Sequence, residues 1–144
     1  MKEEERVCVV LYKVVDGHPR YGVLKRKKNW EGWELVKGHM EETPEETART
    51  EVREEAGIDE VEEIESIGCE AGWTYEEDGE EVDVDCRCFL VRVPPDASID
   101  VDDNPHEEHE MGYFLNLRDA RDILTHDNQR ELLQKASERI GEKL

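Results

Sequence analysis

Residues 38–58 read GHMEETPEETARTEVREEAGI, and this stretch decides the fold because it marks both ends of a helix. Thr43 is a suitable N-cap, and Pro44 fits the first helical position. Gly57 can adopt the left-handed backbone conformation that ends a helix. We therefore predict a helix that runs from Pro44 to about Glu55.

Three glutamates of this helix, Glu51, Glu54 and Glu55, are spaced i, i+3 and i+4, which places their carboxylates on one face. Like charges at this spacing destabilise a helix by about 0.2–0.5 kcal/mol per pair, so a positive group should compensate them. Arg49, Arg53 or solvent could do so. A hard divalent cation is the other candidate, because Mg²⁺ prefers oxygen ligands and links carboxylates to phosphates. A chain with 39 acidic residues also produces such a trio by chance.

Patterns on either side of the helix predict strands, hairpins and further helices. Asp16-Gly17 and Asp78-Gly79 have the chemistry of tight hairpin turns. The expected strands span residues 7–15, 21–24, 61–75, 82–93 and 113–115, with one or two short strands between 30 and 36 and one or two helices over 117–144. Strands around one internal helix, with helices at the end, indicate an α+β layered domain rather than a doubly wound parallel sheet.

The helical stretch resembles the signature of the Nudix hydrolases, G-x5-E-x7-R-E-U-x-E-E-x-G-U, in which U is a bulky aliphatic residue. The positions in register with it are Glu42, Glu51, Val52, Glu54, Glu55, Gly57 and Ile58. There are two departures. Only three residues separate Gly38 from Glu42, where the signature has five, and Thr50 occupies the position of the arginine. In the family that arginine is thought to brace the catalytic loop.

The resemblance implies the fold class and the domain organisation. We expect a Nudix-type α/β/α sandwich with a mixed central sheet, one catalytic helix and C-terminal helices. A single Nudix hydrolase domain would then cover residues 1–144.

The resemblance also implies a metal centre. Mg²⁺ or Mn²⁺ would be bound by Glu51, Glu54 and Glu55, with the carbonyl of Gly38 as a further ligand. Such cations neutralise a pyrophosphate, lower the pKa of a bound water and align it for attack on phosphorus. Glu42 would orient the helix or help to position the water, so Glu54 and Glu42 are candidate catalytic residues.

Two further stretches resemble the asymmetrical diadenosine tetraphosphate hydrolases. Residues 33–39, WELVKGH, are similar to W-x-x-P-K-G-H, with Val36 at the proline position. Residues 108–120, EHEMGYFLNLRDA, are similar to E-H-x-x-x-x-W-L-x-L-E-E-A, with Phe114 at the tryptophan position. This implies cleavage of a dinucleoside polyphosphate. ADP-ribose, oxidised nucleoside triphosphates and a cap-like RNA 5′ end remain open, as does a nucleotide-sensing domain with little turnover, which Thr50 and the shortened loop favour.

Positive groups near the helix are candidates for contact with substrate phosphates. We expect this role for Lys37 and His39, which adjoin the signature, and for Lys25 and Lys27 in a basic run. The basic run equally suits an edge strand that lysines protect from pairing.

A stacking aromatic and a general base are also expected. Tyr113 is the candidate for stacking on a base, with Phe114 facing inward. Glu108 is the candidate base, and Glu110 is an alternative. His106 and His109 could also serve near neutral pH, although histidines in acidic loops are usually solvated.

The formal net charge of −20 argues against binding to nucleic-acid backbones or to anionic membranes. No run reaches the roughly 18 apolar residues of a membrane span, and the first residues lack the apolar core of a signal peptide, so we expect a cytoplasmic protein. The acidic composition resembles that of haloarchaeal cytosolic proteins. The expected partner is a small nucleotide substrate, and the chain is expected to be a monomer or a homodimer.

Four cysteines occur at positions 8, 69, 86 and 88, and their spacing matches neither a zinc finger nor a dense disulfide framework. We therefore expect buried reduced thiols rather than metal ligands.

Overall fold

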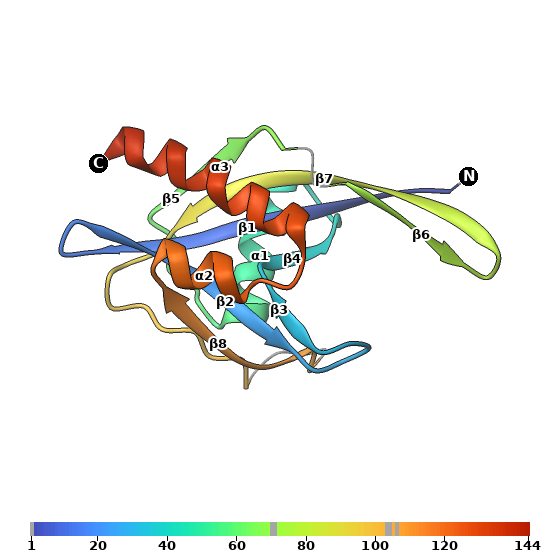
Figure 1. Cartoon of the computed structure of the whole chain (residues 1–144), viewed down its shortest axis with the longest axis horizontal. Coiled ribbons are helices and arrows are strands. Elements are labelled where there is room, and N and C mark those ends of the chain that lie inside the picture. Colours follow the sequence, from blue (N-terminus) through green and yellow to red (C-terminus); the bar gives the residue numbers. More distant parts are fainter. Residues whose placement is uncertain (1, 70–71, 103–104, 106) are drawn as a thin grey trace.

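The structure is a computed structural model that describes residues 2–69, 72–102, 105 and 107–144. In these residues one mixed sheet carries helices on both of its faces (Figure 1). The strands are β1 (Lys2–Val15), β2 (His18–Arg26), β3 (Gly32–Glu34), β4 (Val36–His39), β5 (Glu63–Ile67), β6 (Trp73–Glu77), β7 (Glu80–Arg92) and β8 (His109–Leu115). The helices are α1 (Pro44–Ala56), α2 (Leu117–Ile123) and α3 (Asp127–Lys143).

The long strands β1 and β7 form the centre of the sheet and run parallel to each other. The strand order is β3-β2-β1-β7-β5, while β4 pairs with β1, β6 with β7 and β8 with β2. All of these other pairs are antiparallel. The mixed sheet confirms the expected α+β class and excludes a doubly wound parallel sheet.

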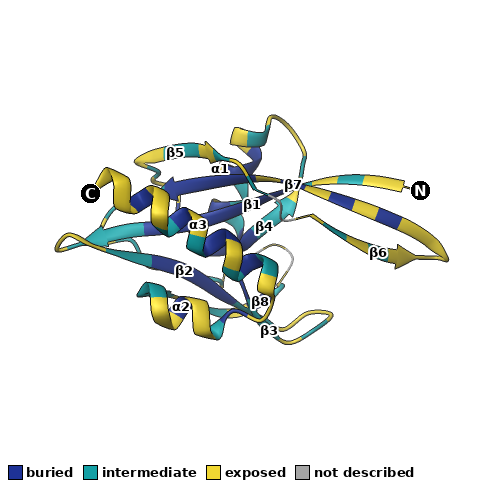
Figure 2. Cartoon of the chain, turned by 45° about the horizontal axis from the view of Figure 1, so that its top comes forward, coloured by how far each residue is buried: buried dark blue, intermediate teal, exposed yellow. Residues whose placement is uncertain are grey.

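Side chains of β1 alternate between two apolar layers. Val7, Val9 and Leu11 pack with α1, whereas Cys8 and Val10 pack with α2 and α3. In β7, exposed residues alternate with buried ones over the first half, so one face of that half is open to solvent (Figure 2). Residues 88–91 are all buried, and here the sheet is covered on both faces, as an α/β/α sandwich requires.

The signals at both ends of α1 are confirmed. The Thr43 hydroxyl accepts a hydrogen bond from the Glu46 N–H at 3.2 Å. At the other end Gly57 has a φ of +69°, and its N–H donates to the Arg53 carbonyl at 3.0 Å. These local interactions fix where α1 begins and ends, and therefore which of its residues face the sheet.

Two expectations were wrong. The strand predicted over residues 61–75 is two strands, β5 and β6, because β7 is long enough to pair with both of them along one edge. Cys69 and Cys88 are disulfide-bonded rather than reduced, since the connection after β5 brings their Cα atoms to 5.9 Å, within bonding range. Cys8 and Cys86 are buried free thiols, as expected.

The expected C-terminal helices are two, α2 and α3. In the described residues no helix has both the length and the apolar character needed to cross a membrane.

Candidate active site

Strand β4 and helix α1 bring Gly38 and Glu51 into contact. Antiparallel pairing places Gly38 opposite Val7 of β1. A Cβ atom on Gly38 would lie only 2.1 Å from Cδ of Glu51, so the Glu51 side chain rests directly against the Gly38 backbone. Two of the residues expected to bind metal are therefore adjacent, although they are 13 positions apart in the sequence.

Glu55 is buried one turn further along α1, and it accepts a hydrogen bond from the Lys37 backbone N–H at 3.1 Å. Burial and then the charges of Glu51 and Glu34 raise the pKa of Glu55 well above its usual value. Burial, together with the charges of Glu54 and other nearby carboxylates, raises the pKa of Glu51 to about 7. Crowded carboxylates of this kind gain stability when a cation is shared between them.

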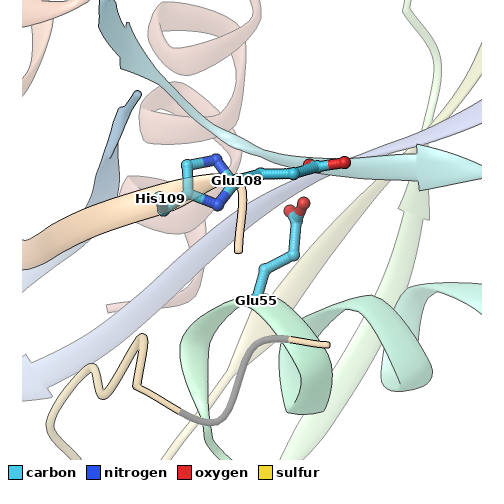
Figure 3. A group of neighbouring side chains, drawn as sticks. All are labelled: Glu55, Glu108 and His109. Carbon is cyan, nitrogen blue, oxygen red and sulfur yellow. The ribbon is translucent and has the colours of Figure 1, made fainter. Parts of the chain in front are cut away.

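Glu108 approaches α1 from the start of β8. Ligand atoms of Glu55, Glu108 and His109 all lie within 4.8 Å of one another, and the side chain of Glu55 points from α1 toward the other two (Figure 3). Together with Glu51, these carboxylates form an oxygen-rich donor set that fits a hard divalent cation.

Behind this cluster lies a carboxylate that the sequence did not indicate, Glu34, which is fully buried. Its Oε2 accepts a hydrogen bond from Arg26 Nη1 at 3.1 Å and lies 3.0 Å from His109 Nε2, while Lys37 Nζ lies 3.3 Å from Oε1. Burial alone would raise the pKa of Glu34, but the His109 hydrogen bond and the charges of Lys37 and Arg26 lower it to about 2. Glu34 thus holds three basic side chains in place.

A cavity of about 560 Å³ adjoins these basic side chains. Its lining residues are Arg6, Arg26, Asn29, Trp30, Lys37, Trp73, Tyr75, His126, Asn128 and Gln129. Arg6 and Lys37 both approach the Trp73 ring, at 5.2 Å and 5.3 Å from its centroid. The cavity therefore combines positive charge with aromatic faces in a protein of strongly negative net charge, which suits a ligand that carries both an anionic group and a ring.

Lys37 links the two parts of the site. Its backbone N–H binds Glu55, and its side chain lines the cavity. Arg26 makes a second link, because it lines the cavity and its Nη1 lies 3.5 Å from Glu108 Oε2.

The other acidic residues predicted for the site differ in their surroundings. Glu54 is half-buried on α1, close enough to Glu51 to raise the pKa of the latter. Glu42 is exposed before α1, and its carboxylate lies beside that of Glu46, whose pKa this contact raises.

The residues predicted to contact phosphate are not all brought together. Lys37 lines the cavity, whereas His39 and Lys25 are not among its lining residues. His39 Nδ1 lies 2.7 Å from Glu4 Oε1, and Lys25 Nζ lies 2.7 Å from Glu110 Oε1.

Lys27 and Tyr113 also fall outside the cavity lining. The Lys27 side chain is exposed, and its backbone N–H donates to the Glu108 carbonyl at 2.9 Å. Tyr113 is 53% exposed on β8, with its ring centroid 6.1 Å from that of Trp33, while Phe114 packs inward as expected.

Two expectations concerned histidines. His109 is buried rather than solvated, because pairing of β8 with β2 places it opposite Arg26 and against Glu34. His106 lies outside the described residues.

The sequence did not single out Arg6, Trp73, Tyr75 or His126, all of which line the cavity. These residues come from β1, β6 and the α2–α3 connection, so only the assembled sheet brings them together. The one usable signal was strand alternation, which places Arg6 on the same face of β1 as Cys8.

Comparison with known proteins agrees with this architecture. A model of the NUDIX domain matches residues 4–136. An Ap4A hydrolase from C. elegans in a binary complex has a similar structure, with a TM-score of 0.74, 23% sequence identity, and coverage of 96% of this chain and 98% of that chain. The NUDIX domain of Shewanella oneidensis NrtR complexed with ADP ribose is also similar, with a TM-score of 0.73 and 16% sequence identity. That match covers 97% of this chain and 90% of that chain.

A third similar structure is the E. coli dihydroneopterin triphosphate pyrophosphohydrolase, with a TM-score of 0.67 and 22% identity over 94% of this chain and 97% of that chain. No curated protein sequence matches significantly. The structural similarities at these identities support the fold, and the domain match covers most of the chain. The chain therefore belongs to the Nudix family of hydrolases.

Proposed function

We propose that this protein is a divalent-metal-dependent pyrophosphohydrolase that cleaves a nucleoside diphosphate linked to another moiety, with dinucleoside polyphosphates such as diadenosine tetraphosphate as its preferred substrates. One observation carries the proposal. The acidic cluster on α1 and the basic, aromatic cavity share Lys37, which would place a bound polyphosphate between a cation and a nucleotide pocket.

In this proposal Glu51, Glu54, Glu55 and the Gly38 carbonyl hold Mg²⁺ or Mn²⁺. The cation supplies positive charge that neutralises the phosphates and activates water toward phosphorus. The crowding that raises the pKa values of Glu51 and Glu55 supports this assignment, because bound positive charge would remove its cost.

The remaining residues orient the substrate and move the proton. Arg6, Arg26 and Lys37 would contact phosphate oxygens, and Trp73 would stack on a base. Glu108 is the proposed general base, and Arg26 orients its carboxylate. Glu34 acts through the basic groups that it holds in place.

The stretches 33–39 and 108–120 support the assignment of diadenosine tetraphosphate as the substrate, because they resemble those of diadenosine tetraphosphate hydrolases. ADP-ribose and oxidised nucleoside triphosphates are alternatives, because substrate choice in this fold depends on residues outside the signature. A nucleotide-sensing domain with weak turnover is the second candidate function. It is favoured by Thr50 at the arginine position and by the shortened loop before α1.

The test is phosphate-product release from diadenosine tetraphosphate, ADP-ribose, 8-oxo-dGTP and ATP, with Mg²⁺ or Mn²⁺, at low and at molar KCl. We expect metal-dependent cleavage of diadenosine tetraphosphate, lost by several orders of magnitude in Glu54→Gln. Glu45→Gln is the matched control, because Glu45 lies on the same helix and pairs only loosely with Arg49, at 3.7 Å. Preferred cleavage of another compound would overturn the substrate assignment, and tight binding without cleavage would favour the sensing domain.

A further inference from the structure

All four cysteines gather on the α3 side of the sheet. Cys8 of β1 is in register with Cys88 of β7, and Cys86 lies two residues before Cys88 on the same face. The Sγ atoms of Cys8 and Cys86 are 2.9 Å apart. Cys69 is bonded to Cys88, and its Sγ lies 3.4 Å from the Cys86 carbonyl oxygen. Three separate segments thus contribute two pairs of cysteines to one apolar cluster.

Basic groups border this sulfur cluster. Arg6 is in register with Cys86, and Lys37 is in register with Cys8. The hydrogen bond from Cys8 and then the charges of Lys37 and Arg6 lower the pKa of Cys86, although burial opposes them. The same hydrogen bond and burial raise the pKa of Cys8, and the charges of Lys37 and Arg6 oppose that rise. Positive charge beside several thiols favours their thiolate forms, which are the forms that bind metals.

We propose that Cys8, Cys69, Cys86 and Cys88 form a second metal centre in the reduced protein, a four-thiolate site for a borderline or soft divalent cation such as Zn²⁺. Thiolate sulfur selects such cations, whereas the carboxylates of α1 select hard ones. The two centres therefore take different metals.

The Cys8–Cys86 half of this centre is already close to the required spacing. Zinc–sulfur bonds of about 2.3 Å in a tetrahedron place the sulfur atoms about 3.8 Å apart. The Cys8 and Cys86 sulfurs need to separate from 2.9 Å by only about 0.9 Å. The Cα atoms of Cys69 and Cys88 are 5.9 Å apart, and their sulfurs separate when the disulfide opens.

Opening of the disulfide requires a two-electron reductant, and a dithiol is one that can serve. The dithiol gives two electrons and two protons to the Cys69–Cys88 bond, becomes a disulfide itself and leaves four thiols in the cluster. Binding of the cation then releases the four thiol protons.

A small cavity of about 10 Å³ lies beside Cys8 and has room for about one water molecule. Lys37 and Trp73 line both this cavity and the large one, so the two cavities are neighbours.

The experiment uses the full chain, reduced with a phosphine under anaerobic, metal-free conditions and titrated with Co²⁺. We expect a thiolate-to-cobalt charge-transfer band that saturates at one Co²⁺ per chain and disappears when Zn²⁺ is added. Cys8→Ser and Cys86→Ser should each abolish the band, while leaving the Cys69–Cys88 disulfide able to form. Glu51→Gln should retain the band, because its carboxylate belongs to the other centre.

Absence of the band in the reduced wild type, or its survival in Cys86→Ser, would overturn the proposal. A second measurement on the wild type does not depend on variants that fold. Zn²⁺ should protect all four thiols of the reduced protein from an alkylating reagent. Equal labelling with and without Zn²⁺ would also overturn the proposal, as would a disulfide that resists reduction in the folded chain.

Discussion

Substitution of Gly38 by alanine tests the geometry of the proposed metal site most directly. The new Cβ would lie 2.1 Å from Cδ of Glu51, whereas ordinary contact begins at 3.4 Å, so the carboxylate must retreat by about 1.3 Å. The clash involves the end of a flexible side chain, and Gly38 is in a strand without positive φ, so the fold should accommodate the change. A displacement of about 1 Å in a catalytic site can cost about 100-fold in rate.

We therefore expect Gly38→Ala to lower kcat/KM by about 100-fold and to raise the Mg²⁺ concentration needed for half-maximal activity, with little change in Tm. Activity is measured over a Mg²⁺ titration, and folding is checked by circular dichroism. Gly141→Ala is the control, because a Cβ there meets no atom within 4 Å. Unchanged activity with unchanged Mg²⁺ dependence, or an unfolded variant, would refute the reasoning.

Four further predictions concern pH, the missing arginine, the core and salt. The folded-state pKa of Glu51 is raised from 4.5 to about 7, so the metal-free protein loses stability as pH rises from about 4.5 through about 7. The loss is below about 3 kcal/mol, because Glu51 is partly exposed and solvent screens its charge. Millimolar Mg²⁺ should therefore raise Tm more at about pH 8 than at about pH 5.5, and equal gains would contradict this. Thr50→Arg should increase kcat if the loop lacks its brace, whereas an unchanged rate would show that another group supports the loop. Leu133→Ala removes a fully buried side chain of α3 and should cost about 2–5 kcal/mol in urea unfolding, and a loss below about 1 kcal/mol would contradict the packing described. With a net charge of −20, the protein should lose circular dichroism signal on dialysis from molar KCl into dilute buffer, and a fully folded protein there would refute adaptation to salt.

Helix α1 could be predicted from the sequence because its determinants are local. Thr43 and Gly57 lie at its two ends, and the spacing of Glu51, Glu54 and Glu55 follows from helical geometry alone. The hairpin turn at Asp78-Gly79 also has local determinants, and the sequence predicted it correctly.

The cavity could not be predicted, because its residues come together only when strands distant in sequence pair. Glu34 has the same appearance in the sequence as the many surface glutamates, and only the pairing of β2 with both β3 and β8 buries it against Arg26 and His109. The Cys69–Cys88 disulfide has a similar origin. Strand β5 pairs with the second half of β7 and β6 with its first half, so Cys69, between β5 and β6, lies close to Cys88. No sequence pattern showed that residues 61–75 would divide into two strands.

The alternation of β1 makes this strand intolerant of insertion and deletion. Arg6 faces the cavity and Cys8 the sulfur cluster, while Val7 between them packs with α1 and lies opposite Gly38. A slip of one residue in the pairing of β1 would turn each of these side chains to the opposite face. A single added or deleted residue would thus separate the large cavity, the thiols and the carboxylate cluster from one another. The spacing of Arg6, Val7 and Cys8 along β1 is therefore as necessary to the site as the side chains themselves.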